Sequence, residues 1–182
     1  MTAPTRLFVL SALAKGGAMY GHQIRRDARV DRAELWSDVR PGSLYGALHR
    51  LEAEGLVRAL RTEREGRLPA RTVYEITGEG RRELAVLQAE AFEEVRFPPD
   101  PVDLALATAS DVDETTLRGH IEDRVRDLTA RLSRLDHLGD RRWPDQTPAD
   151  DLVLEHARLR LRAELEWHGL VLDQLGKLGG DR

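Results

Sequence analysis

A short amphipathic helix within residues 41–57 constrains the fold of this chain more than any other feature. A Pro-Gly turn opens this stretch, and the side chain of Ser43 can cap the helix that follows. A glycine near its end predicts a left-handed helix stop. The apolar residues recur at the spacing of one helical face: Leu44, Leu48 and Leu51. We therefore expect a helix whose apolar side is packed on a core.

The opposite face of this helix is small, hydroxylated and basic. It carries Ser43, Tyr45, Gly46, His49, Arg50 and Ala53. Hydroxyl and guanidinium groups on a narrow helix suit a DNA major groove, where they can meet phosphates and base edges. Arg50 is the best candidate for a guanine contact, although it would serve a phosphate equally well. The alternative is an ordinary amphipathic surface helix.

The elements around this helix predict a winged helix-turn-helix. Helical patterns precede it at residues 5–15 and 20–30, and strand patterns follow at residues 56–62 and 71–77. Three helices followed by a hairpin describe a winged helix, whose hairpin lies beside the recognition helix. The hairpin arginines would then reach the DNA backbone or minor groove: Arg64, Arg67 and Arg71. The alternative is a solvated hairpin with charged edges.

The second half of the chain predicts long helices. A linking helix at residues 81–95 ends at a proline-rich break, which places a domain boundary between residues 96 and 97. A short apolar segment and two long helices follow, at residues 102–109, 113–138 and 150–178. The expected fold is thus mainly α with a small β-hairpin wing: a winged-helix DNA-binding domain with its linking helix (1–96) and a helical dimerisation domain (97–182).

The apolar stripes on the two long helices are wider than one helix pair can bury. The last helix carries a stripe through Leu154, Leu161, Leu165, His168, Leu172 and Leu175, and a second through Leu152, Leu159 and Leu170. A second copy of the chain is the simplest cover, which predicts a two-fold homodimer with coiled-coil-like contacts. The alternative is that both helices fold back on the winged domain.

Charge and composition narrow the functional classes. Residues 1–82 hold 15 Arg and Lys against 10 Asp and Glu, whereas residues 83–182 hold 13 against 22, so only the first half suits a polyanion. The absence of cysteine excludes disulfides and thiol chemistry. Histidines lack the HExxH spacing, and there is no phosphate loop or nucleophile elbow, so we expect no metal, cofactor or enzyme activity. The longest N-terminal apolar run is too short to span a bilayer, and we expect a cytoplasmic protein.

Residues 5–85 resemble the winged-helix domain of the PadR family of bacterial transcriptional regulators. The matching residues are Tyr20-Gly21, Pro41-Gly42-Ser43-Leu44-Tyr45, Leu48, Leu51-Glu52, Glu54-Gly55-Leu56, Tyr74, Ile76-Thr77 and Gly80. The layout after Pro98 resembles the family branch with an extended C-terminal dimerisation domain. The chain departs from the family pattern after Gly21, where an aromatic and an acidic residue are common and His22 and Gln23 stand here.

The resemblance implies a homodimer that binds a two-fold symmetric operator, usually represses nearby genes, and is often released by a small hydrophobic effector. By position, it makes Ser43 and Tyr45 DNA contacts and places Tyr20 near the backbone. Phe92, Trp143, Trp167 and His168 are candidate walls for the effector, or alternatively interface packing residues. Other readings are a ligand-independent activator and a winged-helix protein-interaction module that does not bind DNA.

Overall fold

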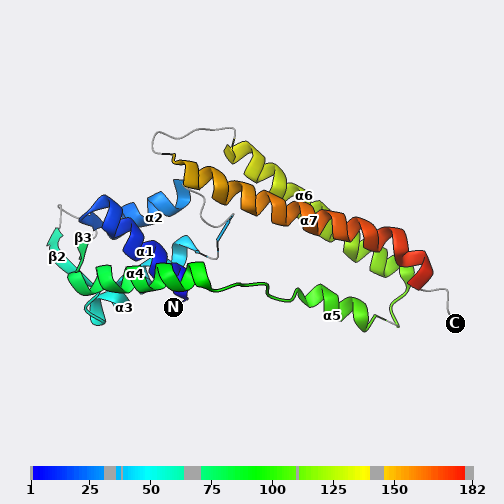
Figure 1. The fold of residues 1–182 in the computed structure, drawn as a ribbon, viewed down its shortest axis with the longest axis horizontal. Helices are drawn as coiled ribbons and strands as arrows, with labels where there is room; N and C mark the ends of the chain where they lie inside the picture. Colours follow the sequence, from blue (N-terminus) through cyan, green and yellow to red (C-terminus); the bar gives the residue numbers. More distant parts are fainter. Residues whose placement is uncertain are drawn as a thin grey trace. The chain divides into compact units, whose positions relative to one another are not determined.

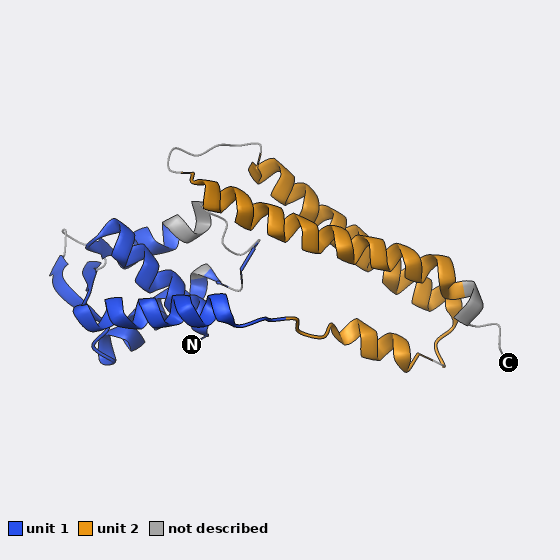
Figure 2. Cartoon of the chain, viewed as in Figure 1, with its two compact units in different colours: residues 1–96 blue, residues 97–182 orange. Residues whose placement is uncertain are grey.

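The structure is a computed structural model that describes residues 2–30, 36–37, 39–63, 71–109, 111–139 and 146–178. The chain divides into two compact units, Met1–Arg96 and Phe97–Arg182 (Figure 2). It is mainly helical, with one small antiparallel sheet in the first unit and long helices in the second (Figure 1). The fold class predicted from the sequence is confirmed.

The first unit contains the expected winged helix. Its elements are α1 (Ala3–Gly16), β1 (Met19–Tyr20), α2 (Gly21–Val30), a 3-10 turn (Pro41–Ser43), α3 (Leu44–Ala53), β2 (Val57–Glu63), β3 (Arg71–Ile76) and α4 (Gly78–Glu93). Helix α1 contacts α2, α3, α4 and β3, so it forms the centre of the core. The predicted apolar face of α3 is confirmed, because Leu44, Leu48 and Leu51 are completely buried.

The sheet has one strand more than the predicted hairpin. Its order is β1-β3-β2, and all neighbours are antiparallel. Tyr20 was expected in the second helix, but it lies in β1 and pairs with Val73 of β3. A strand of two residues is too short for a sequence period, which explains why it was missed. Its effect is to fix the start of α2 against the wing.

The ends of α3 show one confirmed cap and one correction. Gly55 has φ +74°, and the Leu56 N–H donates to the Leu51 carbonyl at 2.9 Å, as in a Schellman motif. Ser43, however, does not cap α3 with its side chain. It lies in the 3-10 turn with helical dihedral angles, and its hydroxyl donates to the Arg40 carbonyl at 2.8 Å.

The wing is joined directly to the end of α3. The Thr77 N–H donates to the Leu56 carbonyl at 3.0 Å, and the Thr77 hydroxyl donates to the Gly55 carbonyl at 2.8 Å. The same hydroxyl accepts the Gly80 N–H at 3.0 Å, which confirms Thr77 as the cap of α4. Recognition helix, wing and linking helix therefore meet at one junction.

The second unit consists of α5 (Pro101–Ala107), α6 (Glu114–Gly139) and α7 (Pro148–Leu178). Helices α6 and α7 lie side by side along their length (Figure 1). One cluster buries Ile121, Val171 and Leu175. The second stripe of α7 remains uncovered within the chain, with Leu152, Leu159 and Leu170 exposed at 73%, 55% and 57%. Within the described ranges, no helix has the length and apolar character needed to cross a membrane.

Candidate nucleic-acid interface

The outer face of α3 presents the side chains that the sequence assigned to it. The exposed residues are Ser43, Tyr45, Gly46, His49 and Arg50. The residues between them, Leu44, Ala47 and Leu48, are buried. The Tyr45 side chain remains 41% exposed although it lies on a packed helix. Because three leucines hold the opposite face in the core, this outer face is a fixed surface and not a mobile one.

Arg50 lies back along its own helix. Its Nε donates to the Gly46 carbonyl at 3.1 Å, one turn earlier. A Cβ at position 46 would make an ordinary van der Waals contact with Arg50 Nη2, at 3.6 Å. Arg50 forms no ion pair with any described residue, and its guanidinium retains donors for an external anion.

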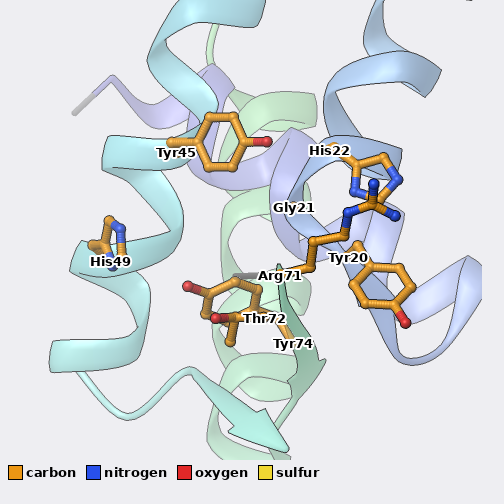
Figure 3. A pocket seen from close by; sticks show the side chains of 8 residues that line it. All are labelled: Tyr20, Gly21, His22, Tyr45, His49, Arg71, Thr72 and Tyr74. Carbon is orange, nitrogen blue, oxygen red and sulfur yellow. The ribbon is translucent and has the colours of Figure 1, made fainter. Parts of the chain in front are cut away.

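A pocket of about 480 Å³ opens between α2, α3 and β3 (Figure 3). Its lining combines aromatic rings, imidazoles and one guanidinium: Tyr20, Gly21, His22, Tyr45, His49, Arg71, Thr72 and Tyr74. In Figure 3, Tyr45 and His49 come from α3, while the guanidinium of Arg71 extends from β3 toward the start of α2. The pocket therefore joins the recognition helix to the wing.

The α2 wall of the pocket is tightly organised. The rings of Tyr20 and His22 stack with centroids 5.3 Å apart and an interplanar angle of 23°. The Tyr20 N–H donates to Gln23 Oε1 at 2.7 Å, so an uncharged side chain occupies the first turn of α2. A Cβ on Gly21 would lie 3.0 Å from Tyr45 Cε1, so glycine allows α2 to approach α3 this closely.

One cation contacts Tyr45, and a second lines the same pocket. The Arg25 guanidinium carbon lies 5.7 Å from the centroid of the Tyr45 ring, within cation–π range. The Arg71 guanidinium makes no hydrogen bond or ion pair with the part of the chain that the structure describes. An unpaired, exposed arginine on a wing strand is available to a phosphate.

Other charges of the wing are already paired. Arg58 binds Glu75 at 2.6 Å, and Glu63 accepts from both Arg61 and Tyr20. The hydrogen bond to Glu63 raises the pKa of the Tyr20 hydroxyl. The hydrogen bond from Arg61, and to a smaller extent the one from Tyr20, lowers the pKa of Glu63. Burial, with a smaller effect of Glu52, raises the pKa of Tyr74. All three groups therefore keep their ordinary charge at neutral pH.

The structure gathers several of the predicted DNA contacts and adds others. Tyr20, Tyr45, His49 and Arg71 line one pocket. Arg64 and Arg67 lie outside the described residues, so their assignment stays a prediction. Sequence reasoning missed the contribution of His22, Thr72 and Tyr74, since a pocket wall depends on where three elements meet. His22 had one indication in the sequence, because this residue departs from the family pattern.

Of the four candidate effector residues, Trp167 and His168 lie together in the second unit. Phe92 belongs to the first unit and is 90% exposed, while Trp143 lies outside the described residues. Trp167 and His168 are adjacent in α7, with ring centroids 4.8 Å apart in an edge-to-face arrangement. Trp167 packs on the cluster around Ile121, so both residues have packing roles within a single chain.

His168 is completely buried and hydrogen-bonded at both ring nitrogens. Its Nε2 accepts from Arg124 Nε at 2.8 Å, and its Nδ1 lies 2.7 Å from the Glu164 carbonyl oxygen, to which it donates. Arg124 also donates to Asp100 Oδ2 at 2.7 Å. No group of three metal-ligating side chains occurs among the residues described.

Comparison with known proteins agrees with this geometry. Residues 9–86 match the transcriptional regulator PadR-like family. The structure of Bacillus subtilis PadR in complex with operator DNA is similar, with a TM-score of 0.70 and 22% identity over 93% of this chain and 98% of that chain. The structure of the same protein in complex with p-coumaric acid has a TM-score of 0.69 and 20% identity, over 94% of this chain and 98% of that chain.

A third solved structure is also similar over most of its length. The Vibrio cholerae virulence activator AphA has a TM-score of 0.73 and 18% identity over 96% of this chain and 99% of that chain. No match was found among curated proteins. At these identities the solved structures support the fold, while the matched segment supports the family. Through residues 9–86, the chain is therefore similar to the PadR-like family of transcriptional regulators.

Proposed function

We propose that this protein binds operator DNA as a homodimer and represses transcription. The α3 face enters the major groove, and the wing follows the adjacent backbone. The observation that carries the proposal is the pocket in which Tyr45 and His49 of α3 meet Tyr20 and the unpaired Arg71 of the wing. The Bacillus subtilis PadR structure in complex with operator DNA shares the fold, which supports DNA binding as the proposed function.

The dimer is proposed from the uncovered surface of α7. Leu152, Leu159 and Leu170 are more than half exposed in the single chain, and leaving them in water is unfavourable. A second copy that packs α7 against α7 would cover this stripe and give two α3 helices for two half-sites. A DNA-binding dimer of this kind would act in the cytoplasm.

Release by a small hydrophobic effector completes the proposal. The p-coumaric acid complex of Bacillus subtilis PadR shows that a protein of this fold holds an aromatic acid. Phe92, Trp143, Trp167 and His168 remain the candidate residues for such a site in this chain. Quenching of tryptophan fluorescence by phenolic acids tests it, and a ligand that releases DNA without changing the fluorescence would contradict a Trp-lined site.

Activation is the second candidate function. The Vibrio cholerae protein of the same fold is a virulence activator, so the fold is compatible with activation. A reporter driven by the bound promoter distinguishes them, because deletion of the regulator raises expression under repression and lowers it under activation.

Mutation of the α3 face tests DNA binding directly. We expect Tyr45→Ala and Arg50→Ala each to abolish operator binding in a gel shift, because base-edge and phosphate contacts contribute roughly 1–3 kcal/mol each and occur twice in a dimer. Arg126→Ala, an exposed arginine on α6, is the matched control and should bind like the wild type. Wild-type affinity in both α3 variants would remove this helix from the interface.

A further inference from the structure

We propose that His22 binds the DNA backbone in its protonated form, together with Arg71, so that DNA binding takes up a proton at each half-site. This inference rests on the proposed DNA binding and assigns a residue and a form of regulation to that site. It concerns the position at which the chain departs from the family pattern.

The first support is the place of His22. Its ring lies on the α2 wall of the pocket, stacked on Tyr20, and is half-buried. Neither ring nitrogen forms a hydrogen bond with any residue that the structure describes. Both nitrogens can therefore donate to an oxygen outside the protein once the ring is protonated.

The second support is Arg71. Its guanidinium extends from β3 toward the wall that carries His22, and it has no carboxylate partner in the described parts of the chain (Figure 3). A phosphate entering the pocket would accept from Arg71 on one side and from His22 on the other. A negative charge at that point favours the protonated imidazole.

The remaining charges around the pocket leave this wall positive. The titratable and charged groups are Tyr20 of β1, Arg25 of α2, Tyr45, His49 and Glu52 of α3, Arg61 and Glu63 of β2, and Arg71 and Tyr74 of β3. Both carboxylates have partners of their own, since Glu63 binds Arg61 and Glu52 lies 4.0 Å from His49 Nδ1. Gln23 fills the first turn of α2 without a charge. Among the residues that the structure describes, no carboxylate therefore competes with DNA for His22.

A histidine of the second unit supplies the control. His120 is exposed on α6 and does not line the pocket. Imidazoles gain their proton near pH 6.5, so the effect falls within an accessible range.

The experiment measures the affinity for a mixed-sequence DNA duplex by fluorescence anisotropy between pH 8 and pH 6 at constant ionic strength. The affinity of the wild type should rise by about five- to tenfold per protomer on acidification, below the limit of about tenfold per proton per pH unit. His22→Gln should remove most of this rise, whereas His120→Gln should keep it. His22→Lys should bind at pH 8 as tightly as the wild type binds at pH 6.

The salt dependence provides a second readout that a merely structural role would not change. The slope of log affinity against log salt should be steeper at pH 6 than at pH 8 by about 0.9 per protomer in the wild type, because one more phosphate is neutralised. In His22→Gln the two slopes should agree. A wild-type pH response in His22→Gln, or no pH response in the wild type, would overturn the role of His22. Either result would leave the proposed DNA binding standing. Failure to bind any duplex at either pH would overturn both this inference and the proposed function.

Discussion

At the residue scale, two glycines allow the close packing that shapes the candidate interface. Gly21 brings α2 within reach of Tyr45, since a Cβ there would lie 3.0 Å from the tyrosine ring. Gly80 lies under the junction of α3 and the wing, where a Cβ would overlap the Leu56 carbonyl oxygen and lie 2.8 Å from Ile76 Cγ1. Neither glycine has a positive φ. Glycine is therefore needed at these positions because a side chain would not fit, and not because of the backbone conformation.

We predict that Gly80→Ala lowers the free energy of unfolding of the first unit by about 1–3 kcal/mol, because the Leu56 backbone must move. Gly78→Ala is the matched control, since a Cβ at Gly78 would have no neighbour within 4 Å. That variant should change stability by less than about 0.5 kcal/mol. Urea titrations compare them, and equal midpoints for the two variants would contradict the packing argument.

At the element scale, one polar chain links α5, α6 and α7 within the second unit. Asp100 accepts the Val102 N–H at the start of α5 and also binds Arg124 of α6, which donates to His168 of α7. The hydrogen bond from the Val102 N–H lowers the pKa of Asp100, and Arg124 lowers it further by a smaller amount. A short helix that buries no residue of its own depends on this cap and on a few apolar contacts for its position.

We predict that Asp100→Ala lowers the stability of the second unit by about 1 kcal/mol, whereas Asp100→Asn lowers it by less than about 0.5 kcal/mol. Asparagine still caps α5, and the Arg124 ion pair is more than a third exposed and therefore weak. Urea titration at pH 7 measures both effects. An equal loss in the Asn and Ala variants would assign the stability to the ion pair instead.

The pH dependence of this pair follows from the lowered pKa of Asp100. The stabilisation is present above the ordinary aspartate pKa of about 3.9 and is lost as the pH falls through the lower value of the folded state. The difference in stability between wild type and Asp100→Asn should therefore shrink below about pH 4. A difference that grows on acidification would contradict the direction of the pKa shift.

At the scale of the whole molecule, the long helices carry the surface on which the proposed dimer depends. The α6–α7 pair buries Ile121, Leu135, Leu154 and Leu175 but leaves the second α7 stripe exposed. The second unit is also acidic, which makes it a poor partner for DNA and suits it to contact another protein surface. Under the proposed function, assembly and DNA binding therefore fall in different units of the chain.

We predict that Leu159→Glu converts a dimer into monomers at micromolar concentration, because it places charges at the centre of the apolar stripe. Leu60→Glu is the matched control, since Leu60 is an exposed leucine of the wing. Light scattering coupled to size exclusion measures the mass of each variant. An unchanged dimer in Leu159→Glu would place the interface elsewhere.

The sequence predicted the elements whose residues repeat with a clear period. The buried face of α3, its Gly55 stop, the Thr77 cap and the long helices all follow from local patterns. Strand β1 and the turn around Ser43 did not, because two or three residues carry no period. The pocket could not be predicted either, since Gly21, Tyr45 and Arg71 meet only after the chain has folded.

The mass of the complex formed with DNA from upstream of the protein's own gene tests the central claim most directly. Size exclusion with light scattering at low ionic strength should show two protein chains bound to one duplex, with the DNA lost as the salt concentration rises. A protein that elutes as a monomer, separate from the duplex at low ionic strength, would contradict this account.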